Sequence, residues 1–409
     1  MKLRLLAALA LAVLLAPVAR ASVEEFSTYD LARMETDDEN FLDHWLTRQP
    51  ASWYREYDAA KNAFRTSQGC YTSGEWYMRH DFKARAEFGE HAYMDVGFQM
   101  VSDDIASWQW LRLDFRWPTS GAGTFGFRFA PTADKANQDF SALWDWGVPG
   151  DPLQIRAVFT VEDMFNSLWS FRQSQVGDHS EPYHSHPVEP ALWVATEGKR
   201  HRFEIGGKWL TPLAKDIVDP DPARNGTYAL WGAKGAMLAE VSFDRWAMDA
   251  RFETEQTQSS ASSALVPGTG RKYCRRWFAE GAARRAIGER WTAEARGAYQ
   301  DRTQDWRPPP SLANMRALDR GVALEFAGDL RENWRLRVGA MHDRVGIAEQ
   351  GNIPAFTYGT RTESRAYVGL EARFGRIRVQ GIEGIELDEE PYEVSFHHDK
   401  GFLQLQAVF

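Results

Sequence analysis

Charged side chains that alternate with apolar ones have the greatest potential for chemistry in this chain. Residues 76–88 show the pattern, because Asp81, Lys83 and Arg85 fall between Phe82, Ala84 and other apolar residues. Side chains of a β-strand point alternately to opposite faces. Each such segment therefore predicts a strand with one charged face and one apolar face.

The charged faces are rich in arginine. They contain Lys83, Arg85, Arg112, Arg116, Arg128, Arg156, Arg202, Arg276, Arg284, Arg290, Arg296, Arg335, Arg337, Arg373 and Arg378, opposed by Asp81, Glu87, Asp114, Glu204, Glu280, Glu294 and Glu371. A guanidinium keeps its charge in any pore environment. Basic side chains that line a pore lower the barrier for anions. Alternatively, these charges pair across strands and rigidify the interior.

Other arrangements suited to chemistry are weaker. His179, His184 and His186 lie near two carboxylates and form a weak candidate for a metal site. His342-Asp343 and His397-His398-Asp399 combine possible bases with carboxylates, but no Ser or Cys lies at a recognisable nucleophile elbow. We therefore expect no enzymatic activity and no cofactor. The spacing of Cys70 and Cys274 leaves their pairing open.

The elements that must position the charged faces begin after two N-terminal segments. Residues 1–21 combine a basic start, a short apolar run and Ala19-Arg20-Ala21, which predicts a cleaved signal peptide. Residues 22–65 form an acidic segment, expected in the periplasm or as a plug in a basic lumen. Its candidate plug residues are Glu24, Glu25, Asp30, Glu35, Asp37, Asp38, Glu39 and Asp43. The strands are assigned to 66–409.

The alternation indicates about 17 strands, and a first strand within 61–70 makes about 18, with 16 as the second choice. The apolar parity changes between Phe243 and Trp246; we expect a bulge there, because a turn would change the count. Short turns are expected at 89–90, 149–152, 197–199, 232–235, 287–289, 329–332 and 375. Long loops are expected at 174–188, 211–225, 257–271, 303–317, 346–360 and 387–400. Short turns on one side and long loops on the other are typical of outer-membrane barrels.

The last strand of the sequence carries a recognisable pattern. Leu403, Leu405, Ala407 and Phe409 share its apolar face, and Gln404 and Gln406 share the other. With the alternating strands and the signal ending, this pattern resembles Gram-negative outer-membrane β-barrel proteins, and the terminal residues are similar to the signal read by the barrel-assembly machinery. An arginine-rich lumen and about 18 strands resemble the alginate-export type of porin.

These observations predict an all-β fold: one antiparallel transmembrane barrel in the outer membrane, with lipid and lipopolysaccharide as partners. The preferred function is passage of solutes, with anions favoured. Alternatives are export of an anionic exopolysaccharide through an envelope-spanning complex, and a closed barrel that serves as a scaffold or binds a partner protein. A soluble β-sandwich also alternates, but the density of aromatic residues favours lipid. The net charge of −9 argues against nucleic acid.

Overall fold

The computed structural model describes the chain in segments. They are residues 57, 60–70, 76–89, 92–103, 107–130, 139–147, 151–161, 183–185, 188–218, 221–263, 266–307, 314–350, 360–387 and 400–409. The predicted signal peptide and all the candidate plug residues, Glu24 to Asp43, lie outside the described residues.

Alternating segments of the sequence form long antiparallel strands. They are β1 (Ala63–Cys70), β2 (Trp76–Phe88), β3 (Ala92–Asp103), β4 (Ser107–Thr119), β5 (Gly123–Ala130), β6 (Asp139–Trp146), β7 (Leu153–Val161), β8 (Tyr183–Ser185), β9 (Val188–Glu197), β10 (His201–Ile217), β11 (Gly226–Phe243), β12 (Trp246–Ser263), β13 (Val266–Ile287), β14 (Trp291–Arg307), β15 (Asn314–Arg331), β16 (Trp334–Gln350), β17 (Thr360–Phe374), β18 (Ile377–Glu386) and β19 (Lys400–Val408). A 3-10 turn, η1 (Pro222–Arg224), precedes β11.

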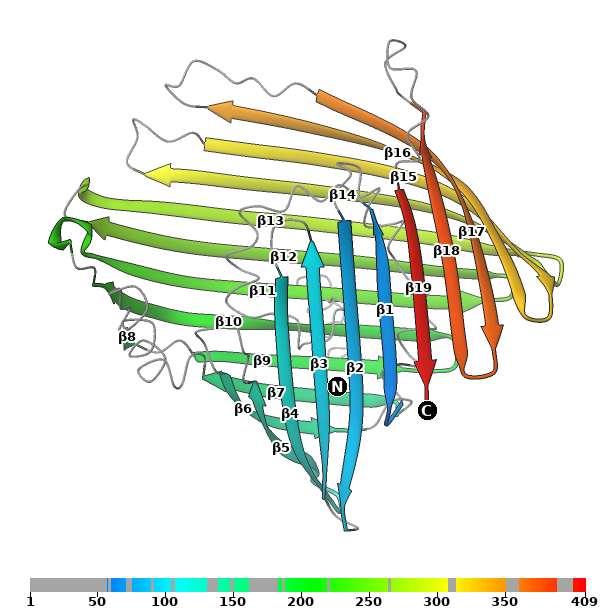
Figure 1. Cartoon of the computed structure of the whole chain (residues 1–409), viewed down its shortest axis with the longest axis horizontal. Helices are drawn as coiled ribbons and strands as arrows, with labels where there is room; N and C mark the ends of the chain where they lie inside the picture. Colours follow the sequence, from blue (N-terminus) through cyan, green and yellow to red (C-terminus); the bar gives the residue numbers. More distant parts are fainter. Residues whose placement is uncertain are drawn as a thin grey trace, which may run out of the picture.

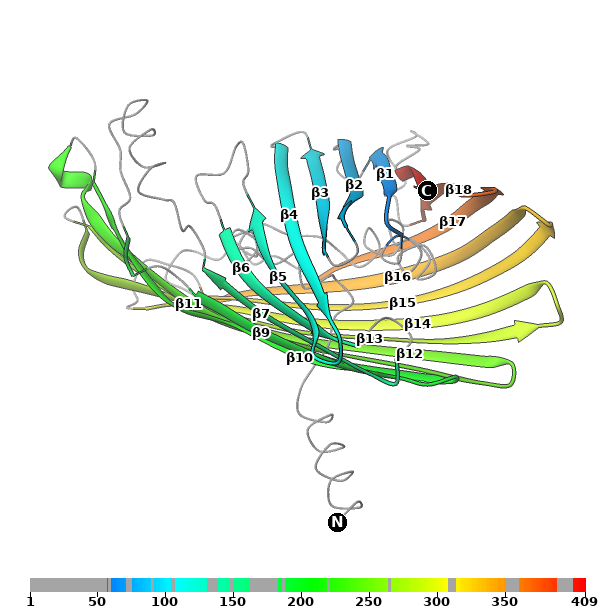
Figure 2. The same cartoon turned by 90° about the horizontal axis from the view of Figure 1, so that it is seen from below.

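The strands close into a barrel. Neighbours in sequence pair with each other, and β1 pairs with both β2 and β19. The short strand β8 pairs with β10 beyond the part that pairs with β9, so β8 and β9 form one interrupted strand in a wall of 18. Strands β1–β4 and β19 cross the strands behind them, β10–β14, steeply (Figures 1 and 2). Such crossing is what strongly tilted barrel strands produce.

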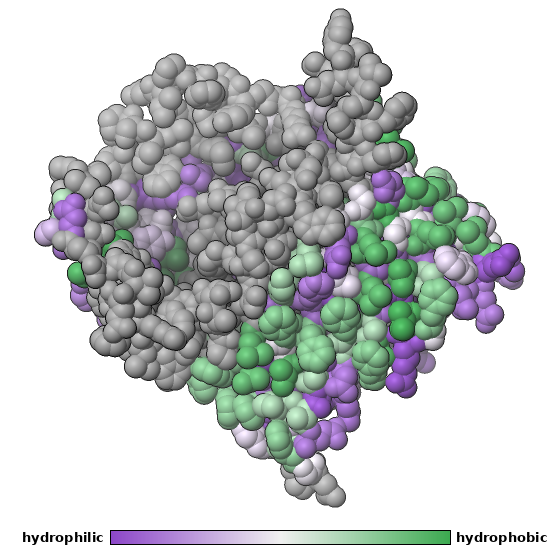
Figure 3. Space-filling view, viewed as in Figure 1, coloured by the Kyte–Doolittle hydropathy of each residue, from purple (hydrophilic) through white to green (hydrophobic). Residues whose placement is uncertain are grey.

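The outward face is apolar. Val322, Leu324 and Phe326, at alternate positions of β15, are 58%, 60% and 51% exposed. Exposed aromatic and large apolar residues also flank the short turns: Phe88, Trp117, Phe125, Trp146, Phe203, Phe243, Trp246, Ile287, Trp291, Leu330, Trp334, Phe374 and Ile377. Apolar residues cover the outer side near β1–β4 and β19 in Figure 3. This apolar band fits the hydrocarbon core of a membrane, and the aromatic girdle beside the short turns fits one membrane interface.

One expected turn is wrong and one expected bulge is a turn. Residues 232–235 lie inside β11, whereas Asp244 and Arg245 form a tight turn between β11 and β12. Asp244 has φ 50°, and Phe243 pairs directly with Trp246. Residues directly opposite across a hairpin face the same side, so the parity change arises from the turn. The two errors compensate, and the count of 18 is correct.

Several expected loops are shorter than predicted. Strand β10 continues to Ile217, and β12 and β13 fill most of the expected loop 257–271. Residues 303–307 likewise belong to β14 and 314–317 to β15. Alternation shows only where one face meets lipid, so strand ends that extend past the apolar band carry little of this signal.

The first and last strands form the closing seam. Seven pairs, from Ala63 with Val408 to Gly69 with Phe402, join β1 to β19. The first strand was expected within 61–70 and is observed at 63–70, so the barrel begins slightly before residue 66. Leu403 on β19 and Phe409, the residue after this strand, are exposed on the outward side, while Gln404 and Gln406 are buried. Leu405 and Ala407 have the same outward parity, but Leu405 is half-buried and Ala407 is only 6% exposed, so the predicted lipid-facing row is covered at Ala407.

No helix among the described residues is long and apolar enough to cross a membrane.

Candidate pore lining

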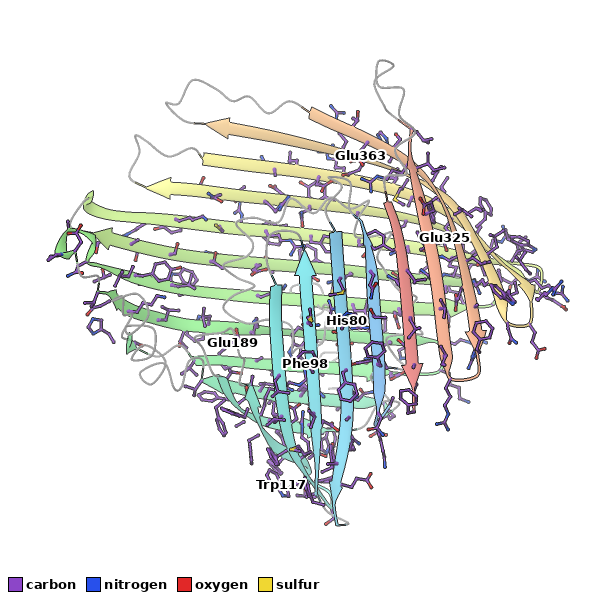
Figure 4. All side chains as sticks on the ribbon, viewed as in Figure 1. His80, Phe98, Trp117, Glu189, Glu325 and Glu363 are labelled. Atoms are coloured by element: carbon purple, nitrogen blue, oxygen red, sulfur yellow. The ribbon has the colours of Figure 1, made fainter. Side chains whose placement is uncertain are left out.

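The inner face carries most of the predicted charges. Those that form ion pairs or hydrogen bonds come from strand after strand of the wall. The inner carboxylates Glu189, Glu325 and Glu363 are labelled on β9, β15 and β17 in Figure 4. Arg290 is an exception, because it lies in the exposed turn before β14 and not on the wall. Residues on both sides of that turn alternate regularly, so the sequence alone does not show that Arg290 belongs to the turn.

On β4–β5, one carboxylate serves three arginines. Asp114 is buried, and its two oxygens lie 2.6 Å from Nε and Nη2 of Arg128 on β5. Two arginines of its own strand are further away: Arg112 Nε at 3.5 Å from Oδ1 and Arg116 Nη2 at 3.6 Å from Oδ2. The fork of Arg128 matches the carboxylate in a bidentate geometry. Three positive charges therefore share one negative charge here.

The same sharing recurs on both sides of this group. Asp81 on β2 accepts from Arg65 Nε at 2.7 Å and from Arg79 Nε at 3.1 Å. Asp145 on β6 accepts from Arg156 Nε at 2.6 Å and also pairs with Arg116. Further along, Arg85 and Asp95 form a bidentate pair at 2.6 and 2.8 Å. The ion pairs of the wall from β1 to β7 thus involve more guanidinium groups than carboxylates.

Around β9–β12, acids and bases are balanced, because Glu253 also accepts from Arg251 Nε at 2.6 Å. Lys234 on β11 lies 3.6 Å from both Glu253 and Glu255 of β12, and all three side chains are buried. Lys208 on β10 pairs with Glu189 on β9 at 2.8 Å. A buried ammonium needs such partners, because an unpaired charge in a low-dielectric site is costly.

The β13–β17 wall combines pairs and further acids. Arg296 contacts Glu280 and Glu294, and Arg337 Nη2 lies 2.6 Å from Glu325 Oε2. Asp319 and Asp343 are 1% and 2% exposed. The paired carboxylates of this wall are neutralised by arginines, as Glu325 is by Arg337 and Glu363 by Arg365.

The remaining predicted residues have varied partners. Arg284 pairs with Glu294 at 2.6 Å, and Arg276 donates to Gln300 at 2.7 Å. Other contacts are those of Arg202 with Glu204 at 3.1 Å, Arg335 with Asp329 at 3.5 Å, Arg378 with Glu371 at 3.8 Å and Arg373 with the carbonyl of Gly375 at 3.5 Å, while Lys83 is half-buried on β2.

Sequence reasoning missed many inner carboxylates. Asp95, Asp145, Glu189, Glu253, Glu255, Glu325, Asp343 and Glu363 all take part in the inner wall or lie buried on it. Most of them come from strands with weak apolar alternation, such as β3, β6, β9 and β12. Once the limits of a strand are known, the residues that alternate with its outward apolar residues must face inward. The alternate apolar residues of these strands are therefore the signal that could have identified the carboxylates.

Neutral groups line the seam. Gln380 Nε2 on β18 donates to Gln404 Oε1 on β19, and Gln404 Nε2 donates to Ser67 Oγ on β1, both at 3.4 Å. An apolar group also lies on the inner face, formed by Phe278, Met341, Ile382 and Phe402 with Tyr367 packed against it. The lumen is therefore charged around most, but not all, of its wall.

The predicted metal residues are only partly described. His184 Nε2 lies 2.8 Å from Asp216 Oδ2, whereas His179 and His186 lie outside the described residues. No group of three or more metal-ligating side chains occurs within the described segments. Cys274 lies on β13, and the side chain of Cys70 is not among those described, so their pairing stays open.

An apolar outer face and a charged inner face on a closed barrel define an outer-membrane β-barrel protein. No protein-family model matches the sequence, and no curated protein matches it. Among solved structures, it is similar to CdiB from Acinetobacter baumannii (TM-score 0.44, 10% identity, 85% of this chain and 60% of CdiB). It is also similar to OccAB3 of Acinetobacter baumannii (TM-score 0.39, 7% identity, 86% of this chain and 99% of OccAB3). A third similar structure is OmpT of Vibrio cholerae (TM-score 0.37, 10% identity, 85% of this chain and 96% of OmpT). This chain thus spans 60% of the length of CdiB.

Proposed function

We propose that this protein is a channel through the outer membrane of a Gram-negative bacterium and that it favours anions. One observation supports this most: the wall is a closed barrel of 18 strands whose inner face carries charges on most strands. Barrels of about 16–18 strands are wide enough to enclose an aqueous passage. The inner wall can contain buried charged side chains because these side chains are hydrogen-bonded to one another.

The shared carboxylates support the anion preference. Asp81 and Asp114 are each contacted by more than one guanidinium, so β2 and β4 present net positive charge to the lumen. Carboxylates on β12, β15 and β17 are each paired with a lysine or an arginine, so they do not offset this excess of positive charge. Fixed positive charge on the wall attracts anions toward it.

Planar-bilayer conductance with reversal potentials tests the proposal. The informative double variant is Arg79→Gln with Arg112→Gln. These arginines are second partners, since Asp81 keeps Arg65 and Asp114 keeps Arg128. The variant therefore removes two positive charges without leaving a buried carboxylate unpaired.

In a salt gradient, we expect the reversal potential of the wild-type pore to have the sign of anion selectivity. We expect the reversal potential of the double variant to lie clearly closer to zero. Arg285→Gln is the matched control, because Arg285 is exposed on the outward face over Trp246. A folded barrel that conducts no ions would contradict the channel, and cation selectivity in the wild type would contradict the role of the arginines.

Export of an anionic exopolysaccharide uses the same basic wall. It predicts block of the conductance by the polymer from one side and a partner complex in the envelope, whereas simple diffusion predicts passage of small anions alone. If the protein is a closed scaffold, we expect no conductance, with or without the polymer.

A further inference from the structure

Two arginines face each other on the outside of the barrel. Arg320 on β15 and Arg344 on β16 are directly opposite, and both are exposed. Their outward direction follows from the alternation on β15, because Val322 and Leu324 at the next positions are 58% and 60% exposed. Like charges placed directly opposite on one face of a sheet are destabilising.

The described residues offer this pair no carboxylate. Asp301 on β14 is the acidic group on the neighbouring outward row, and its two oxygens accept from Arg316 Nε at 3.1 Å and Nη2 at 2.6 Å. No ion pair links Arg320 or Arg344 to an acid within the described part of the chain. An anion supplied from outside the protein would relieve the repulsion.

The depth of the pair on the strand specifies where that anion lies. Trp334 marks the aromatic girdle at the short turn, and Arg344 is reached after ten further positions of β16. At about 3.3 Å per residue and a tilt of about 45°, this corresponds to about 23 Å along the membrane normal. That height is close to the apolar band of an outer-membrane barrel, about 25 Å. Because the short turns of such barrels lie in the periplasm, the two guanidinium groups lie at the far edge of the band, in the headgroup layer of the outer leaflet.

The neighbours of the pair suit an amphiphilic phosphate. Tyr299 is directly opposite Arg320, with the guanidinium carbon 5.8 Å from its ring centroid, and Thr362 is opposite Arg344. On the row nearer the membrane centre, His342 Nδ1 and Ser364 Oγ are 2.8 Å apart and exposed or half-exposed. Hydroxyl and guanidinium donors thus stand directly above lipid-facing Val322.

We propose that Arg320 and Arg344, with Tyr299 and Thr362, bind a phosphate of the lipid A headgroup of lipopolysaccharide. Arginine binds phosphate through paired N–H donors, which gives shorter and stronger hydrogen bonds than a neutral group. The acyl chains then lie along the exposed apolar rows of β15 and β16. The proposal needs only the outer-membrane location, so it stands or fails independently of conductance.

The test uses the full-length protein, purified folded in detergent and mixed with lipid A that carries both phosphates. The variant is Arg320→Gln with Arg344→Gln, and native mass spectrometry measures bound lipid A. Because two charge-assisted hydrogen-bonding groups are lost, we expect at least about tenfold weaker binding. Arg285→Gln is the matched control, since its exposed guanidinium lies over Trp246 at the opposite girdle.

Two further arms identify the ligand. Lipid A without phosphates should bind the wild type as weakly as the double variant binds the phosphorylated form, and phosphatidylglycerol should bind less tightly than phosphorylated lipid A. Undiminished binding of phosphorylated lipid A to the folded double variant would overturn the site. Equal binding of phosphatidylglycerol would overturn the assignment to lipopolysaccharide. Circular dichroism and heat modifiability on gels confirm that each variant is folded.

Discussion

The hydroxyl of Tyr367 on β17 donates a 2.7 Å hydrogen bond to Oε2 of Glu325 on β15. Between these two strands lies β16, whose Gly339 is covered by the Tyr367 ring. Glu325 Oε2 also accepts from Arg337 Nη2 at 2.6 Å. An aromatic side chain thus spans a strand and joins three neighbours on the inner wall, which fixes their register more firmly than backbone pairing alone.

Tyr367→Phe removes the hydroxyl and keeps the ring. Glu325 retains Arg337, so we expect a loss of about 1.5–3 kcal/mol, the net value of a hydrogen bond to a charged group. Urea unfolding of the barrel in lipid vesicles measures it. Tyr93→Phe is the control, because the ring of Tyr93 is contacted by Arg85 at 3.9 Å and this contact survives the change. Equal stability of Tyr367→Phe and wild type would show that the hydroxyl does not join the strands.

Gly339→Ala tests the close approach beneath the same ring. A Cβ at this position would collide with the Tyr367 ring and lie 2.6 Å from the carbonyl oxygen of Leu324. Since backbone cannot move away easily, we expect about 1–3 kcal/mol of destabilisation and less folded protein in the membrane. At Gly381 a Cβ would meet nothing within 4 Å, so Gly381→Ala serves as the control. A similar yield for the two variants would contradict the tight fit.

Asp114→Asn keeps the size of a buried side chain but removes the charge that three arginines share. Because an uncompensated buried charge is left, we expect a loss of about 3–5 kcal/mol. The same change should raise anion selectivity, since Arg112 and Arg128 become less neutralised. Reversal potentials measure the second effect. Asp329→Asn is the control, because its carboxylate is half exposed and 3.5 Å from Arg335. Stable protein with unchanged selectivity would contradict the shared-charge interpretation.

How far the sequence specified this barrel differs between its two faces. The outward face follows from alternation alone, because lipid requires apolar residues at every second position, as in 322–326. The inward face depends on knowing the register. Lys234 and Glu253 approach each other only because β11 and β12 pair at Lys234 with Glu255. Nothing in the spacing of these residues along the chain shows that contact.

The arginines and their partners illustrate the same limit. Arg112, Arg116 and Asp114 are neighbours on one strand, so their shared face is visible in the sequence. Arg128 joins them only through the β4–β5 hairpin, where Asp114 and Arg128 are directly opposite. The sequence therefore indicated that charged residues share one face of the strands, while the balance of these charges required strands such as β3 and β12, whose weak alternation concealed their carboxylates.

The turn between Phe243 and Trp246 offers a test of the corrected topology. Asp244 has φ 50°, a left-handed conformation that Asp tolerates and that β-branched residues resist. We expect Asp244→Val to destabilise the hairpin by about 1–2 kcal/mol and to slow folding into vesicles, and Asp244→Gly to fold as well as wild type. Arg245→Val is the matched control, because Arg245 belongs to the same turn and is not among the residues with positive φ. If Asp244→Val folded as fast as Arg245→Val, the left-handed turn would not be the point at which β11 and β12 reverse direction.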